Sequence, residues 1–126
     1  MSLRSPLGRV LGTGSAKDGT GHWWAQRVSS VALIPLTLWF FYSLMMLPDL
    51  DYSTVKAWLA LPISSFLAVL SVTVVTHHSY LGTTVVVEDY VHGAGVKVVT
   101  LMGLRFLYVL FGGASIFAIL RVAFGT

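Results

Sequence analysis

Two adjacent histidines, His77 and His78, lie inside a long apolar segment of this 126-residue sequence. Ionisable side chains at membrane depth are costly, so they are candidates for haem or metal ligation, although a histidine can also hydrogen-bond between packed helices. Neighbouring residues of a helix point about 100° apart, so these two rings cannot hold the two faces of one haem. If a haem is held by two histidines, its second axial ligand must come from another polypeptide.

One helical face would join His78 to two further residues. Gly82 follows at the i, i+4 position, where its missing side chain would let a flat macrocycle or a neighbouring helix approach the backbone. Asp89 is eleven residues from His78, which on a helix is a net rotation of about 20° and a rise of about 16 Å. If Asp89 marks the membrane surface, the imidazole of His78 lies near the middle of the bilayer.

The segment Glu88–Gly93 (EDYVHG) places a carboxylate, a phenol and an imidazole close together in sequence. Lipid-soluble substrates complete their proton chemistry near water, so Asp89 could relay protons and Tyr90 could donate a hydrogen bond to a quinone carbonyl. The alternative is an ordinary polar loop with an interfacial tyrosine.

Polar and aromatic residues also precede the first apolar segment. Trp23 and Trp24 form a pair that is typical of an interfacial anchor, and His22 comes directly before them. Arg27 could reach lipid phosphate or bind an anionic group such as a haem propionate. Arg105, inside the last apolar segment, could reach the interface or pair with the carboxylate of Asp89.

These residues must be positioned by membrane helices, because 56% of the residues are hydrophobic and only 10% are charged. A span of about 20 helical residues crosses the hydrocarbon core. The sequence predicts an all-α integral membrane protein with three transmembrane helices in a hetero-oligomeric bundle. We expect an N-terminal tail and one anchor domain whose spans are approximate: tail 1–27, domain 28–126, spans 28–47, 57–87 and 98–120. The second span exceeds the required length, so it tilts or extends into the headgroups.

The N-terminal tail contains a glycine-rich stretch, Gly12–Gly21, with poor helix propensity. We expect a flexible tail that docks on a partner, and neither a secretory signal nor an arginine-rich mitochondrial presequence. This favours a bacterial inner-membrane protein.

Four of the eight basic residues precede the first span, which indicates topology rather than nucleic-acid binding. The positive-inside rule places residues 1–27 and the loop 88–97 in the cytoplasm, and the loop 48–56 and the C-terminus on the periplasmic side. The sequence has no cysteine, so any iron–sulfur cluster with thiolate ligands must belong to a partner.

The run from His78 to Gly93, with Gly82 and the Asp89–Tyr90 pair at their spacing, resembles the small cytochrome b membrane anchor of succinate dehydrogenase, the D subunit of complex II. The resemblance implies that His78 is an axial ligand of haem b. It also implies that Tyr90 contacts ubiquinone, that Asp89 supports proton delivery, and that Arg27 and His22 lie near the haem propionates.

The same resemblance implies three partners: a flavoprotein with covalent FAD, an iron–sulfur protein, and a larger cytochrome b anchor that supplies the other haem ligand. The chain would then be an enzyme subunit without a succinate-oxidising site of its own. Two related alternatives are a fumarate reductase anchor and a haem-free structural anchor. A small transporter or proton channel is a third, but an odd number of spans without an internal repeat counts against it.

Overall fold

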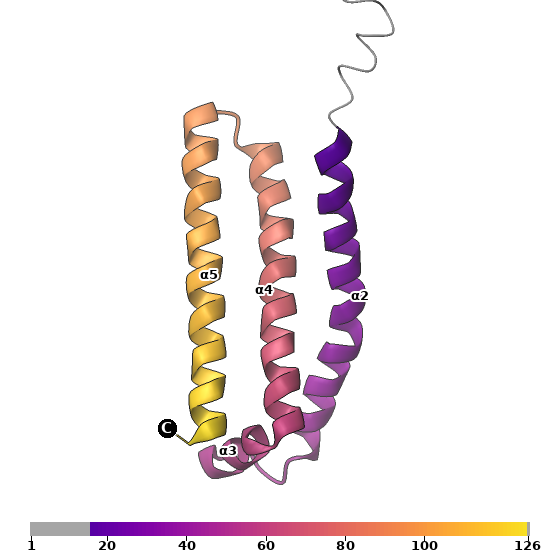
Figure 1. Cartoon of the computed structure of the whole chain (residues 1–126), viewed down its shortest axis with the longest axis vertical. Helices are drawn as coiled ribbons and strands as arrows, with labels where there is room; N and C mark the ends of the chain where they lie inside the picture. The colour runs from indigo at the N-terminus through magenta and orange to yellow at the C-terminus, as the bar shows by residue number, and fades with distance from the viewer. Residues whose placement is uncertain (1–15, 126) are drawn as a thin grey trace, which may run out of the picture.

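The structure is a computed structural model that describes the backbone of residues 16–125 and the side chains from residue 20 onward. This part of the chain is all-helical, as the composition predicts (Figure 1). Its elements in chain order are α2 (Ala16–Met46), α3 (Tyr52–Ala60), α4 (Pro62–Tyr90) and α5 (Ala94–Phe124).

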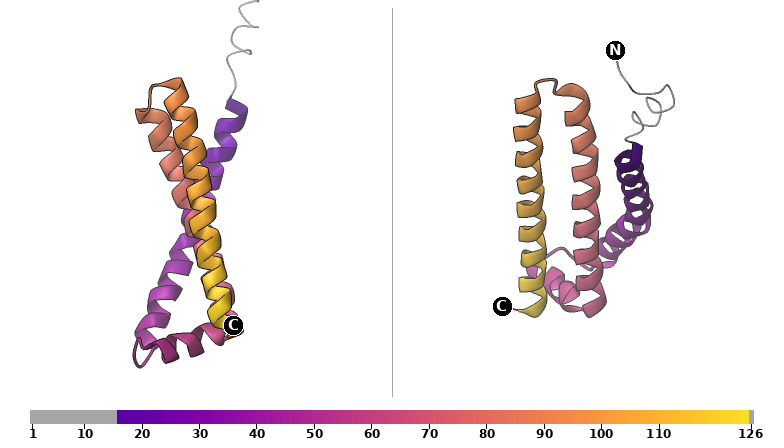
Figure 2. Two further views of the ribbon diagram at one scale, coloured as in Figure 1. Left: turned by 90° about the vertical axis from the view of Figure 1, so that its left-hand side faces the viewer. Right: turned by 45° about the horizontal axis from the view of Figure 1, so that its top comes forward.

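The three long helices form a single row in which α4 lies between α2 and α5 and packs against both, while α2 and α5 do not pack on each other. Figure 2 shows that α4 and α5 run side by side and that α2 crosses them obliquely. The short helix α3 lies across one end and contacts both α4 and α5. Because the row is one layer thick, each long helix leaves a broad face without a neighbour from this chain.

The described core is correspondingly small. Its buried hydrophobic residues are Leu36, Ala68, Leu81 and Val87. Large apolar side chains are instead exposed along every long helix, and two on α5 illustrate this: Phe106 is 73% exposed and Phe117 is 64% exposed. Helices that are apolar on all sides belong in lipid or inside a larger bundle, because such surfaces are not stable in water.

Two helical stretches, Thr20–Met46 and Ala94–Phe124, are each long and apolar enough to cross a membrane. A third crossing is present if α3 and α4 count together as one broken span, since they are bent by 95°. The expected span 57–87 is therefore divided between the end of α3 and α4. Proline has no N–H and disfavours helical backbone at the residue before it, so Leu61 is extended (ψ 127°) and Pro62 begins a new helix.

The helix α2 begins earlier than the apolar pattern indicates. It starts at Ala16, so residues 16–27 of the expected tail are helical despite their glycines, whereas residues 1–15 lie outside the described part of the chain. Hydropathy locates the part of a helix that lipid surrounds, but the helix can continue into water because each glycine costs only about 1 kcal/mol relative to alanine. For the same reason α4 continues to Tyr90 and α5 already begins at Ala94.

The contact between α4 and α5 fixes the rotation of α4. Gly112 is buried, and a Cβ added there would lie 2.9 Å from the Thr76 side chain, so a small residue lets the helices approach. Nearby, the Tyr108 hydroxyl lies 2.8 Å from Thr83 Oγ1, and Thr83 Oγ1 itself donates to the backbone oxygen of Ser79. With these residues of α4 facing α5, the opposite face of α4 is presented to α2.

The two ends of the row differ in what they carry. The start of α2, the end of α4 and the start of α5 lie at one end, and α3 and the C-terminus lie at the other (Figure 1). This pairing agrees with the predicted grouping of the segments 16–27 and 88–97 on one side of a membrane.

Candidate functional site

His78 is half-buried and faces α2. Its Nδ1 atom lies 2.9 Å from Ser29 Oγ, and its Nε2 atom lies 3.5 Å from the side-chain nitrogen of Gln26. One turn further along α4, a Cβ added to Gly82 would lie 3.5 Å from the same Gln26 nitrogen. Of the two neighbours expected at Gly82, the structure therefore shows the approach of an adjacent helix.

The hydrogen-bond partners of His78 fit a haem ligand. A histidine that binds a metal through one ring nitrogen normally hydrogen-bonds through the other to a protein oxygen, which fixes the orientation of the ring. Ser29 Oγ occupies that role at Nδ1, so Nε2 is the atom that can ligate. Only the flexible Gln26 side chain lies against Nε2, at a distance too long for a strong hydrogen bond. No group of three or more His, Asp or Glu side chains in residues 20–125 could hold a metal ion, but a haem needs only one ligand from this chain.

Two buried polar atoms lie on the same face of α2. His22 Nε2 and Gln26 Oε1 have no hydrogen-bond partner in the described part of the chain. Such an atom costs about 1–3 kcal/mol and calls for an explanation such as a bound polar group. The positions of His22, Gln26 and Ser29 follow the i, i+4, i+7 spacing of one helical face, which places His22 on the side of α2 that meets His78.

Gln26 and Ser29 were not predicted as site residues. Their signal in the sequence is a polar face at the start of an otherwise apolar helix, a pattern that marks buried or functional positions in membrane helices.

Arg27 lies outside the polar cluster around His78. Its guanidinium carbon is 5.3 Å from the centre of the Trp23 ring, and the side chain is exposed. Adjacent residues on a helix diverge by about 100°, so Arg27 is turned away from the face that carries Gln26. Of the two residues expected near the propionates, only His22 shares the helical face of α2 that carries Gln26 and Ser29.

His77 and His78 point in different directions from α4, as their spacing predicts. His77 lines a groove between α2 and α4 together with Ser29. It is exposed and also lines a groove of about 270 Å³ between α4 and α5. The polar and aromatic side chains that share this groove include Tyr80, Arg105 and Tyr108. Tyr80 and Tyr108 pack edge to face, with ring centres 5.8 Å apart.

Arg105 is exposed beside this groove. Within residues 20–125 no ion pair joins it to Asp89, so the pairing considered from the sequence is not formed in this structure.

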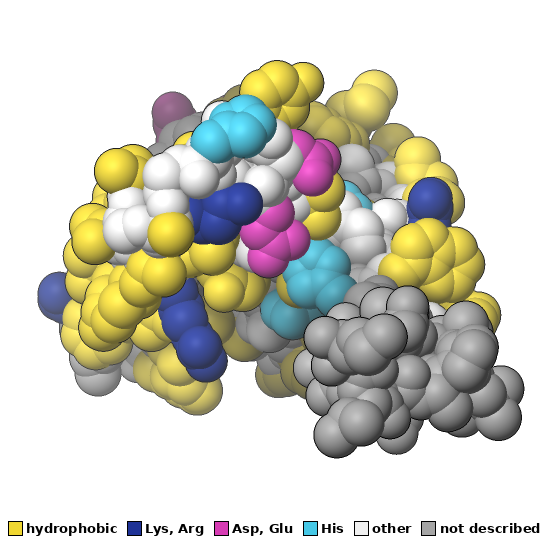
Figure 3. Space-filling view, turned by 90° about the horizontal axis from the view of Figure 1, so that it is seen from above, with side chains coloured by type: hydrophobic (Ala, Val, Ile, Leu, Met, Phe, Trp, Pro, Cys, Tyr) yellow, Lys and Arg dark blue, Asp and Glu magenta, His cyan; other side chains and the backbone are white. Residues whose placement is uncertain are grey.

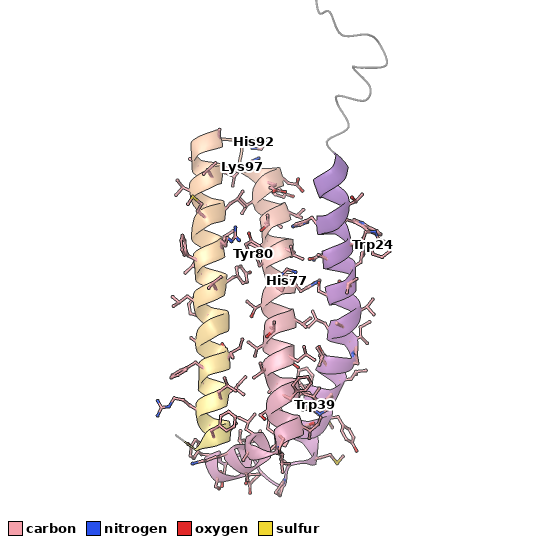
Figure 4. All side chains as sticks on the ribbon, in the orientation of Figure 1. Trp24, Trp39, His77, Tyr80, His92 and Lys97 are labelled. Carbon is pink, nitrogen blue, oxygen red and sulfur yellow. The ribbon has the colours of Figure 1, made fainter. Side chains whose placement is uncertain are left out.

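Asp89 and Tyr90 end α4 and are exposed, Tyr90 by 78%. The turn beyond them is held by two contacts, since His92 Nδ1 lies 3.1 Å from the Tyr90 backbone oxygen and Lys97 Nζ donates to the Glu88 backbone oxygen at 2.8 Å. His92 and Lys97 lie together at this end in Figure 4. Viewed from above in Figure 3, acidic, basic and histidine side chains gather here and hydrophobic side chains surround them.

The chain offers two polar locations on one continuous helix. His78 and Tyr90 are twelve residues apart on α4, which is about 18 Å along its axis. The deeper location carries an imidazole packed against α2, and the outer one carries a carboxylate and a phenol that are free to meet another molecule. This arrangement suits a membrane subunit that contributes part of a site rather than a whole one.

Comparison with known proteins identifies the class. Residues 1–120 match the family described as succinate dehydrogenase/fumarate reductase transmembrane subunit. The chain belongs to this family of membrane proteins, and the resemblance drawn from the run His78 to Gly93 is confirmed.

Individual relatives specify the kind of subunit. A succinate dehydrogenase hydrophobic membrane anchor subunit of Paracoccus denitrificans is 31% identical over 125 residues, which cover 99% of this chain and 96% of the relative. The subunit of the same description from Rickettsia bellii is 32% identical over 89 residues, 71% of each chain. A succinate dehydrogenase membrane anchor subunit of Reclinomonas americana is 30% identical over 93 residues, 71% of this chain and 77% of the relative. At this level the function is that of a membrane anchor subunit of succinate dehydrogenase.

Proposed function

We propose that this anchor subunit holds one face of haem b through His78 and forms one wall of a ubiquinone site with Asp89 and Tyr90. The observation that carries the haem assignment is the environment of His78. Its Nδ1 is engaged by Ser29, and only the Gln26 amide lies against its Nε2. Two buried atoms on the same face of α2, His22 Nε2 and Gln26 Oε1, have no partner among the described residues.

Bound haem b would supply a one-electron redox centre within the membrane. The residues of this chain would orient it: His78 from α4 as an axial ligand, and His22 from α2 toward a propionate. Arg27 is the weaker propionate candidate, because its guanidinium lies over Trp23. His77 diverges from His78 by about 100° on α4 and cannot bind the other face of the same ring, so the second axial ligand would come from a larger cytochrome b anchor subunit.

At the outer location, the exposed Tyr90 phenol would donate a hydrogen bond to a quinone carbonyl while the isoprenoid tail stays in lipid. The neighbouring Asp89 carboxylate would pass protons from water to the reduced quinone. Succinate oxidation would take place on partners, namely a flavoprotein with covalent FAD and an iron–sulfur protein. This chain has no cysteine and so has no thiolate ligand for a cluster.

We further infer that the protein spans a bacterial inner membrane three times, with the start of α2 in the cytoplasm and the C-terminus in the periplasm. The native chain has no cysteine, so single cysteines report accessibility directly. His92→Cys and Ser53→Cys are exposed positions at opposite ends of the row. A membrane-impermeant thiol reagent added to intact spheroplasts should label only Ser53→Cys, and inverted vesicles should label only His92→Cys. Labelling of both from one side would contradict three spans.

Affinity purification from membranes, with the tag on this chain, tests the assembly. We expect three partners to co-purify: a polypeptide with covalently bound flavin, an iron–sulfur protein and a second apolar anchor. Succinate should then reduce quinone in the preparation, and comparison of this rate with fumarate reduction separates the two directions of catalysis. Purification of this chain without any flavoprotein would contradict the proposal.

A haem-free structural anchor is the second candidate. Its support is that Ser29 and Gln26 already give His78 neighbours from the adjacent helix, as a histidine that serves only packing would have. The presence of all partners without a b-type haem spectrum would favour this alternative.

A further inference from the structure

We propose that Ser29 fixes the tautomer of His78, keeping the proton on Nδ1 so that Nε2 retains the lone pair that iron requires. Ser29 is thus a positioning residue that acts through His78 and need not touch the haem. The inference rests on the proposed function, since it matters only if His78 is a haem ligand.

The protons available to the Ser29 hydroxyl and the His78 ring determine the tautomer. Ser29 is buried, with 7% of its surface exposed, and its hydroxyl has a single proton. Ser29 Oγ donates that proton to the Gln26 backbone oxygen at 3.0 Å, because a carbonyl can only accept. The 2.9 Å contact with His78 Nδ1 must then use a proton from the ring. A neutral imidazole has one N–H, so Nε2 is unprotonated.

The side chain of Gln26 supports the same tautomer. Its amide nitrogen, a donor, faces His78 Nε2 at 3.5 Å, as suits an unprotonated ring nitrogen. Its Oε1, which a protonated Nε2 would attract, is buried without a partner in the described part of the chain. The distance is long for a hydrogen bond, but the orientation agrees with the tautomer that Ser29 requires.

The neighbouring Ser30 bears on which ring nitrogen of His78 carries the proton. Ser30 Oγ donates to the same Gln26 backbone oxygen at 2.8 Å, but its only hydrogen bond in this structure is that one. If Ser30 alone served the carbonyl, Ser29 could turn its proton toward Nδ1 and the ring proton would move to Nε2. His78 could not ligate iron in that form. Replacing Ser29 should therefore change the haem, whereas replacing Ser30 should not.

The experiment uses the purified, haem-containing complex with Ser29→Ala, Ser29→Thr and Ser30→Ala. A hydrogen-bond acceptor at Nδ1–H makes Nε2 more basic and so favours ferric haem, and loss of such partners typically changes metal affinity by about 10- to 100-fold. At the tenfold end of this range, Ser29→Ala should weaken the binding of ferric haem relative to ferrous haem about tenfold. That change raises the midpoint potential by about 59 mV for one electron.

The electron paramagnetic resonance signal of the low-spin haem should shift in Ser29→Ala as well. Ser29→Thr keeps the hydroxyl and should retain the wild-type potential and signal, and so should Ser30→Ala. A wild-type potential in Ser29→Ala, or an equal shift in Ser30→Ala, would overturn the inference. If Ser29→Ala loses haem altogether, full haem content in Ser29→Thr supports the role of the hydroxyl, and haem loss in both refutes it.

The haem assignment of His78 and the role of Ser29 can be refuted separately. Absence of haem from the wild-type complex, or a haem that survives His78→Ala unchanged, would remove the proposed function itself. A haem that depends on His78 but is indifferent to Ser29→Ala would remove only the role of Ser29.

Discussion

In the purified complex, His78→Ala should abolish the low-spin b-type spectrum or convert it to a high-spin form. The substitution removes the one imidazole of this chain that both faces α2 and has Ser29 at Nδ1. A haem left with a single protein ligand can take water or another weak ligand at the open position, and that change is visible in the absorption bands. Reduced-minus-oxidised spectra of wild type and variant provide the measurement.

His77→Ala is the matched control for this experiment. It removes the same side chain one residue away, but His77 is exposed on the groove shared with Arg105 and Tyr108. Its spectrum should remain low-spin. Loss of the low-spin signal in His77→Ala with its retention in His78→Ala would reverse the assignment.

Tyr90→Phe should lower quinone reduction about tenfold, which corresponds to about 1.4 kcal/mol of transition-state stabilisation. Phenylalanine keeps the ring and removes only the hydroxyl donor, whose hydrogen bond strengthens as the quinone oxygen gains negative charge. Succinate oxidation by an artificial acceptor that takes electrons upstream of the quinone should be spared. Asp89→Asn should likewise lower the quinone-linked rate and spare the artificial-acceptor rate. If the carboxylate delivers protons, the pH dependence of the quinone-linked rate should also change.

Tyr52→Phe is the matched control for Tyr90→Phe. Tyr52 is also exposed, by 72%, but it begins α3 at the opposite end of the row. Both quinone-linked and artificial-acceptor rates should be unchanged there. Equal losses of both rates in Tyr90→Phe would indicate failed assembly, and no loss of either would leave Tyr90 as an interfacial anchor.

Helical periodicity was sufficient to predict how residues of the same helix are oriented relative to one another. The divergence of His77 from His78 follows from about 100° per residue, and in the structure His78 contacts Ser29 Oγ whereas His77 is exposed on the groove toward α5. The spacing that puts His78 and Asp89 on one helical face was also read from the sequence, and both residues lie on α4, which continues past the expected end of the span at 87 to Tyr90. Relations of this kind need only the geometry of a single helix.

Relations between helices could not be predicted in this way. Because α2 is apolar around most of its circumference, its sequence does not reveal which face meets α4, and Gln26 and Ser29 were missed for that reason. Pro62 indicates a kink near Leu61, but hydropathy does not record the 95° change of direction, because the residues on both sides are apolar. Arg27 was expected near the haem, but its guanidinium lies over an adjacent aromatic ring.

The exposed apolar faces of the three-helix row also have a physical meaning. A row of three helices with so few buried residues leaves α4 open on faces that a larger anchor and lipid would cover. Under the proposed function, His78 and Tyr90 would contribute parts of sites that other chains complete.

The most direct measurement is the haem content of the wild-type complex, purified through this chain and normalised to covalently bound flavin. The proposed function predicts a b-type haem in a one-to-one ratio with flavin, which is low-spin when oxidised and is lost or converted to high-spin in His78→Ala. A complex that contains all its partners and reduces quinone at the normal rate, but contains no haem, would contradict it.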